Sequence, residues 1–140
     1  MAGYSDTPLH RKLGIKPGHR VTLLDAPDGF EATLDGLPGD VVIRHDLSGD
    51  APADVIVLFV TERHELQARL DETRRGMAQE GGFWVAWPKR ASKVPTDITD
   101  DVVRKLALPT GLVDNKVCAI DGTWSGLRLV IRRANRISAG

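Results

Sequence analysis

Runs of apolar residues between polar turns dominate the chain and predict buried strands. The longest run covers residues 55–60, is rich in β-branched side chains, and predicts the central strand. Shorter runs at residues 21–24, 41–43 and 83–87 predict three more strands. None of these runs alternates apolar with polar positions, which is typical of parallel strands that are buried on both faces. The pattern therefore predicts a mostly parallel sheet.

Helical spacing appears between these runs. A proline at the first helical position and two leucines on one face predict a short helix over residues 8–13. Apolar positions at helical intervals predict a longer helix that begins after Thr61 and is stopped by the glycines at 81–82. Thr99 predicts the start of a third helix, with two aspartates in its first turn. The order strand, helix, strand across residues 55–87 is a βαβ unit with parallel strands and a right-handed crossover.

The C-terminal part of the chain carries the signature of a hairpin. Residues 117–120 and 127–132 read as strands on either side of a polar turn at 121–126, which predicts an antiparallel hairpin at the sheet edge. The expected fold is a three-layer, Rossmann-like α/β domain. Its mostly parallel sheet has about six strands and is closed by this hairpin. We expect residues 1–140 to form one domain, with a frayed tail at 135–140.

Charge is balanced over the whole chain but unevenly distributed. The net charge is zero at pH 7, so the total gives no support for a nucleic acid or an anionic membrane as partner. Residues 25–54 hold eight acids and one base, whereas residues 104–136 hold seven bases and two acids. Solvated faces of opposite sign explain this asymmetry, and a basic partner-binding edge near the C-terminus is the alternative that leaves nucleic acid open.

Cysteine and histidine usage argues against metal chemistry. Cys118 is the single cysteine, so an internal disulfide is excluded, and its apolar neighbours predict a buried strand thiol. The four histidines are scattered without metal-ligand spacing, and we assign no metal. No apolar stretch resembles a signal peptide or approaches the roughly 20 residues of a membrane span. We therefore expect a cytoplasmic protein that does not contact a membrane.

The loop after the first predicted strand is one candidate ligand site. Asp25, Asp28 and Gly29 lie in it, and the next strand is followed by Asp46, as at the start of a nucleotide-binding βαβ unit. The glycine pattern G-x-G-x-x-G is absent, and acids together with Pro27 would repel a phosphate and block close approach of the backbone. A dinucleotide is therefore disfavoured. The loop is then either part of a site for an S-adenosylmethionine-like ligand or an ordinary turn.

The end of the strand 83–87 is the second candidate site, since ligands bind at the carboxyl ends of parallel strands. An aromatic ring there could stack on a planar group, and the following cations could hold an anion near the helix that starts at Thr99. The alternative is a tryptophan that fills a corner of the core beside solvated cations. The candidate residues here are Trp87, Lys89, Arg90, Lys93, Thr96 and Asp97. Trp124 in the hairpin turn is either a lid on the core or a contact for a partner.

Several short motifs are specific enough to compare with known families. They are residues 4–9 (YSDTPL), 12–14 (KLG), 83–89 (FWVAWPK), 95–97 (PTD), 117–120 (VCAI) and 124–127 (WSGL). With these motifs the chain resembles a family of short bacterial proteins, mostly of actinobacterial type, that is classed only as a domain of unknown function. The resemblance covers nearly the whole chain and implies a soluble bacterial protein without an established activity.

The order of elements also resembles a shortened class I methyltransferase. Residues 13–24, the strand–helix–strand unit and the closing hairpin carry this second resemblance. The glycine-rich first motif of that family is absent and two strand–helix units are missing, so no catalytic residue is carried over. We therefore expect a non-catalytic module, without a cofactor, that binds a protein partner or a small anionic ligand. The alternative is a reduced S-adenosylmethionine-dependent methyltransferase-like enzyme.

Overall fold

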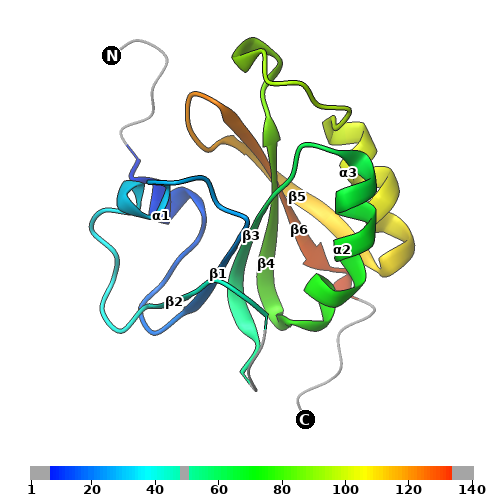
Figure 1. Cartoon of the computed structure of the whole chain (residues 1–140). Coiled ribbons are helices and arrows are strands. Elements are labelled where there is room, and N and C mark those ends of the chain that lie inside the picture. The colour runs from blue at the N-terminus through cyan, green and yellow to red at the C-terminus, as the bar shows by residue number, and fades with distance from the viewer. Residues whose placement is uncertain (1–6, 48–50, 134–140) are drawn as a thin grey trace.

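The computed structural model describes residues 7–47 and 51–133, and these form a six-stranded sheet with the order β2-β1-β3-β4-β6-β5 (Figure 1). The first four strands of that order are parallel, whereas β6 runs antiparallel to both β4 and β5. The predicted Rossmann-like α/β fold with a C-terminal antiparallel hairpin is confirmed. The strands are β1 (Arg20–Leu24), β2 (Val42–Arg44), β3 (Ala53–Phe59), β4 (Met77–Pro88), β5 (Leu112–Ala119) and β6 (Trp124–Ile131). The expected tail at 135–140 lies outside the described residues.

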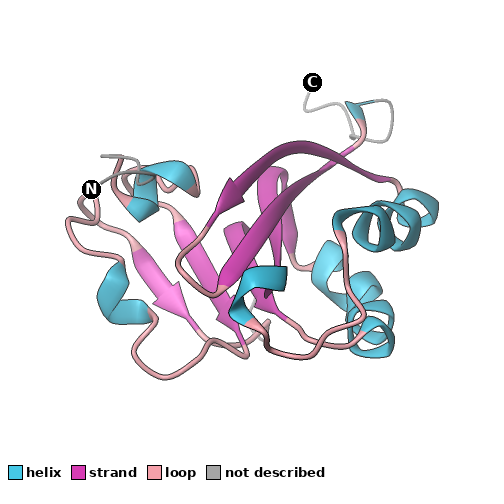
Figure 2. Ribbon diagram, turned by 90° about the horizontal axis from the view of Figure 1, so that it is seen from above, coloured by secondary structure: helices cyan, strands magenta, loops and turns pink. Residues whose placement is uncertain are grey.

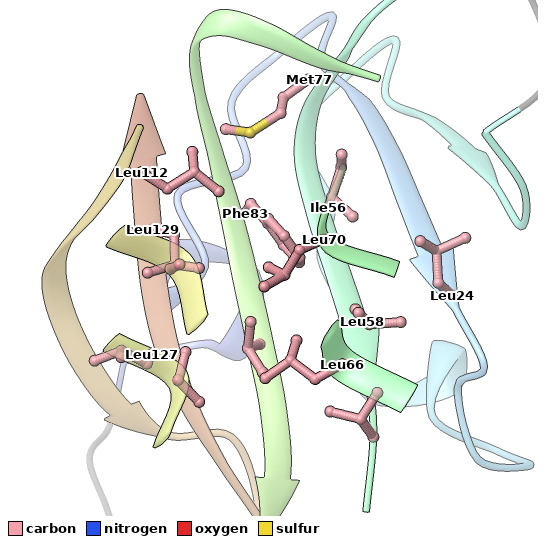
Figure 3. Packing of buried hydrophobic residues seen from close by; sticks show 14 of the residues in the cluster. Leu24, Ile56, Leu58, Leu66, Leu70, Met77, Phe83, Leu112, Leu127 and Leu129 are labelled. Atoms are coloured by element: carbon pink, nitrogen blue, oxygen red, sulfur yellow. The ribbon is translucent and has the colours of Figure 1, made fainter. Parts of the chain in front are cut away.

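Two helices cover one face of the sheet. They are α2 (Arg63–Arg75) and α3 (Asp100–Ala107), and both lie on the same side of the strands (Figure 2). Leu66 and Leu70 of α2 pack against Phe83 of β4, and Leu129 of β6 extends the same apolar cluster toward α3 (Figure 3). Burial of this leucine-rich stripe is what holds α2 on the sheet, since helices in proteins are stabilised mainly by packing of an apolar face.

The opposite face is covered by the short helix α1 (Leu9–Lys12) and by the segment between β1 and β2. Trp84 is the largest side chain buried there, and it is fully inaccessible to solvent. Its indole N–H donates a hydrogen bond to the backbone oxygen of Leu13, 3.1 Å away. Because Leu13 follows α1 directly, this bond attaches the N-terminal segment to the centre of the sheet. Only the 3₁₀ helix η1 (Glu31–Thr33) interrupts the connection from β1 to β2.

The second helix is shorter than its sequence predicts. It ends at Arg75, and Met77, expected on the helix, is instead the first residue of β4. The glycines at 81–82 lie inside β4, where they allow close packing. A Cβ added to Gly81 would lie 2.8 Å from the backbone oxygen of Asp54, so a side chain there would push β4 away from β3. Glycine in this stretch marks a close approach of two strands and not the end of a helix.

The strand order reverses at β1. From β1 the chain passes to β2 on one side, and it then returns to form β3 on the other side of β1. Such a reversal of strand order opens a gap at the carboxyl ends of the strands, which is where open α/β sheets bind ligands. None of the helices in the described part of the chain is long and apolar enough to cross a membrane.

Candidate functional site

A cavity of about 480 Å³ lies at the carboxyl ends of β1 and β2, against α2. Its volume falls within the roughly 300–1,000 Å³ typical of small-molecule sites. Two leucines and three polar residues of its lining come from the ends of β1 and β2 and the residues just after them, and two charged residues come from α2. We call it the β1–β2 cavity, and it is lined by Leu24, Asp25, His45, Asp46, Leu47, Arg69 and Glu72.

Ion pairs fix the charged wall of the β1–β2 cavity. The guanidinium of Arg69 lies 2.8 Å from a carboxylate oxygen of Asp25 and 2.8 Å from one of Glu72. On the other side, His45 Nε2 lies 2.7 Å from a carboxylate oxygen of Glu31. The lining thus holds three carboxylates against one guanidinium, which favours a ligand that offers hydroxyl or amino hydrogens or a positive charge.

Asp25 has an unusual backbone conformation. Its φ angle is 58°, in the left-handed region that favours glycine, at the point where β1 ends. Aspartate tolerates this region better than most residues, and here its side chain is also held by Arg69. Residues with a strained backbone persist only where the surrounding structure holds them in that conformation, and they are common at ligand sites. At the end of β1 the chain therefore turns through a left-handed aspartate, at a position where sequence patterns look for glycine.

Only Asp25 among the residues predicted for binding lines the β1–β2 cavity. Asp28 and Gly29 follow it in the same loop and are exposed, outside the lining. The sequence pattern indicates Asp46 but not His45, Arg69 or Glu72. A polar pair directly after a short predicted strand was the available signal for His45. Nothing local distinguishes Arg69 and Glu72 from other charged residues on the outer side of a helix.

Residues after β4 have mainly structural contacts. Trp87 is only 8% exposed and lies in the apolar cluster beneath α2 and α3, on the face opposite Trp84. With so little of its surface exposed, the Trp87 side chain packs in the core.

Thr96 and Asp97 join the segment after β4 to the start of α2. The Thr96 hydroxyl donates to the backbone oxygen of Thr61 at 2.6 Å. The Asp97 carboxylate accepts a hydrogen bond from the backbone N–H of Arg63 at 2.6 Å. Glu62, at the N-cap position, makes no side-chain cap, so Asp97 supplies the missing acceptor from a distant part of the chain.

The three cations after β4 surround the 3₁₀ helix η2 (Arg90–Ser92). Arg90 and Lys93 are exposed, and Lys93 has a φ angle of 62° at the end of this turn. Lys89 is partly buried, and its backbone N–H donates to the oxygen of Thr123 at 2.7 Å. This bond brings Lys89 next to the turn of the hairpin, close to Trp124.

An aromatic row connects the two candidate regions. The ring of Trp124 makes an edge contact with Phe59 at the end of β3, with 5.1 Å between centroids. Phe59 makes a similar contact, at 4.8 Å, with Phe30 from the segment after β1. Trp124 is partly exposed, whereas both phenylalanines are buried. The row therefore fixes the loop after β1 and the hairpin turn relative to the same strand.

The geometry defines a Rossmann-like domain with a polar cavity at the carboxyl edge of its parallel strands. No protein-family model and no curated protein matches the sequence. Solved structures do match the fold. A SAM-dependent methyltransferase from Aquifex aeolicus superimposes with a TM-score of 0.60 at 16% identity, covering 86% of each chain.

Two further structures carry an adenosyl ligand. DhpI in complex with SAH superimposes with a TM-score of 0.60 at 12% identity, covering 90% of this chain and 83% of DhpI. LepI in complex with SAM gives a TM-score of 0.54 at 16% identity, covering 89% of this chain. The chain spans only 39% of the length of LepI. At these identities the likeness establishes the fold.

These neighbours correct the functional expectation. A non-catalytic binding module without enzymatic activity was expected, but the fold is that of methyltransferases that use SAM, so the enzyme alternative is the better supported. The resemblance to a class I methyltransferase is thus supported at the level of the fold. The resemblance to a bacterial domain of unknown function is not supported, because no family model matches.

Proposed function

We propose that this protein binds an S-adenosyl ligand in the β1–β2 cavity and acts as a SAM-dependent, methyltransferase-like protein. The observation that carries the proposal is a cavity of about 480 Å³ at the carboxyl ends of β1 and β2, in a fold that superimposes on methyltransferases. SAM supplies a methyl group on a positively charged sulfonium, which a nucleophilic acceptor can take.

The side chains that line the cavity fit such a ligand. Asp46 and His45 follow β2 and offer acceptors for ribose hydroxyl groups. Leu24 and Leu47 supply an apolar wall against which a base could pack. The carboxylates suit a cationic sulfonium compound, whereas a phosphate would be repelled. The same charges that disfavour a dinucleotide therefore favour an adenosyl sulfonium.

Arg69 would act as a positioning residue. Its guanidinium holds the carboxylates of Asp25 and Glu72 at one wall of the cavity, with both distances at 2.8 Å. In this arrangement an ion pair fixes the loop after β1 to α2, in place of the close backbone packing that glycines would allow. Replacement of Arg69 by methionine would remove the cation that both carboxylates contact and so release the loop from α2.

Thermal denaturation with and without SAM tests the proposal. We expect SAM in excess over its dissociation constant to raise the midpoint, because a ligand that binds only the folded state stabilises it. Asp46→Ala should reduce this shift because Asp46 lines the cavity. Asp28→Ala should leave it unchanged, since Asp28 is exposed and outside the lining. Absence of any shift with SAM and with SAH, confirmed by calorimetry, would refute the proposal.

A further inference from the structure

A second cavity lies next to the β1–β2 cavity, between the end of β2, the start of β3 and the C-terminal end of α2. Its volume of about 300 Å³ is at the lower limit of what small-molecule sites usually have. Leu47 and Glu72 line both cavities, so the two adjoin one another. We call it the arginine cavity, because Arg44 of β2 and Arg75 of α2 are both part of its lining.

Hydrogen bonds join the three elements around the arginine cavity. The Nη2 of Arg44 donates to the backbone oxygen of Ala51 at 3.0 Å. At the other side, the backbone N–H of Ala53 donates to the oxygen of Gly76 at 2.8 Å, so this carbonyl at the end of α2 is already occupied. A Cβ added to Gly76 would lie only 3.0 Å from Leu47, which shows how closely Leu47 packs on the end of α2. The walls are therefore fixed before any ligand binds, which lowers the cost of ordering them.

The guanidinium of Arg44 uses little of its binding capacity inside the protein. A guanidinium has five N–H donors, and the bond to Ala51 is the one that Arg44 makes to the described residues. Its Nε is buried and makes no hydrogen bond to those residues, whereas buried polar groups in proteins almost always have a partner. Arg104 of α3 gives the contrast, since three aspartates surround it at 3.0–3.3 Å. The positive charge expected near the C-terminus is thus neutralised on α3, and that of Arg44 is not.

Arg75 adds a second positive charge to the arginine cavity. Its Nη1 lies 3.8 Å from a carboxylate oxygen of Asp71, which is too long for a hydrogen bond, and both side chains are exposed. Such a pair contributes little and leaves the donors of Arg75 available. The acid in the lining, Glu72, is held by Arg69 at 2.8 Å. The arginine cavity therefore has a positive balance of charge, opposite to that of the β1–β2 cavity.

We propose that the arginine cavity binds the carboxylate or phosphate group of a small molecule. Guanidinium groups bind both kinds of oxyanion through paired, charge-assisted hydrogen bonds. A nucleic acid is disfavoured because its binding depends on many basic contacts along the backbone, and this cavity offers two arginines. The inference does not rest on the adenosyl ligand, since Asp25, His45 and Asp46 line the other cavity and not this one.

The experiment titrates the full chain with inorganic phosphate and, separately, with succinate, at constant ionic strength. Binding is followed in ¹H–¹⁵N correlation spectra, which report the Nε–H groups of arginine as well as the backbone amides. We expect saturable shifts of the Arg44 Nε–H and of the amides of Arg75 and Gly76. The probe that binds more tightly identifies the ligand as a phosphate or a carboxylate compound. Potassium chloride over the same range should give no saturable shift of these signals.

Single substitutions on one helix provide a matched comparison. Arg75→Gln should weaken binding by about fivefold or more, because it removes a charge in contact with the anion. Arg63→Gln removes the same charge from an exposed position at the first turn of α2, roughly 18 Å away at about 1.5 Å per residue. That separation exceeds the Debye length of about 8 Å, so this control should change the affinity by less than about twofold. Arg44→Gln should weaken binding by about tenfold or more.

Three results would overturn the inference. The first is the absence of saturable shifts with both probes, and the second is equal weakening by Arg75→Gln and Arg63→Gln. The third is the same response to chloride as to phosphate and succinate, which would indicate a general salt effect. If circular dichroism shows that Arg44→Gln does not fold, the exposed Arg75→Gln and the wild type still decide. The titrations contain no SAM, so their failure and a failure of the adenosyl proposal are observed separately.

Discussion

The hydrogen bond of Trp84 allows a quantitative test of how the N-terminal segment is attached. Replacement of Trp84 by phenylalanine removes the donor to the Leu13 oxygen and leaves that acceptor without its partner in a buried place. An unsatisfied buried group costs about 1–3 kcal/mol, and the partly filled space left by the smaller ring adds to this cost. We expect the free energy of unfolding to fall by about 2–4 kcal/mol.

Urea denaturation followed by far-ultraviolet circular dichroism measures this loss without relying on tryptophan fluorescence. Trp124→Phe serves as the control, because Trp124 is partly exposed, whereas Trp84 is fully buried. We expect the control to lose less than about 1 kcal/mol. Hydrogen exchange should also accelerate around α1 in Trp84→Phe alone. If Trp84→Phe lowers the free energy of unfolding no more than Trp124→Phe does, the bond from Trp84 to Leu13 does not hold the N-terminal segment on the sheet.

Three further changes test other contacts. Asp97→Ala removes the acceptor for the Arg63 N–H at the start of α2 and should lower the free energy of unfolding by about 1 kcal/mol in urea denaturation; an unchanged midpoint would contradict the capping role. Gly126→Ala places a Cβ 2.8 Å from a methyl carbon of Ile120, and this overpacking should lower the free energy of unfolding by about 1–3 kcal/mol. A variant as stable as the wild type would show that the neighbouring side chains move aside. Burial raises the pKa of Cys118 on folding, so the stability that the thiol contributes is lost as the pH rises above the ordinary thiol pKa. Cys118→Ala should therefore flatten the alkaline part of the curve of unfolding free energy against pH. An identical slope in the variant and the wild type would refute this.

The sheet could be predicted from the sequence because its central strands are continuous apolar runs. Residues 55–60 and 83–87 need no tertiary information, since their composition alone indicates burial on both faces. The boundary between α2 and β4 could not be predicted, because Met77 fits the helical spacing as well as it fits a strand. Glycines that stop a helix in most sequences here permit two strands to approach closely.

The candidate site was less predictable than the fold. Asp25 could be placed at the end of β1 because the loop follows an apolar run directly. Arg69 and Glu72 belong to the site only because α2 lies beside that loop, which local sequence does not encode. Trp87 was singled out as an aromatic residue at a strand end, but the alternation of side chains along β4 directs it into the core under α2.

The bonds from Thr96 and Asp97 have a consequence for the order in which the protein is made. Helix α2 supplies Arg69 and Glu72 to the β1–β2 cavity, yet the first turn of α2 is capped by a residue synthesised 34 positions after Arg63. A nascent chain that has emerged from the ribosome as far as β4 therefore contains every residue that lines the cavity. It still lacks Asp97, which caps the helix that forms one side of the cavity. The proposed binding of SAM should therefore be weaker in chains truncated after β4 than in chains that extend past Asp97.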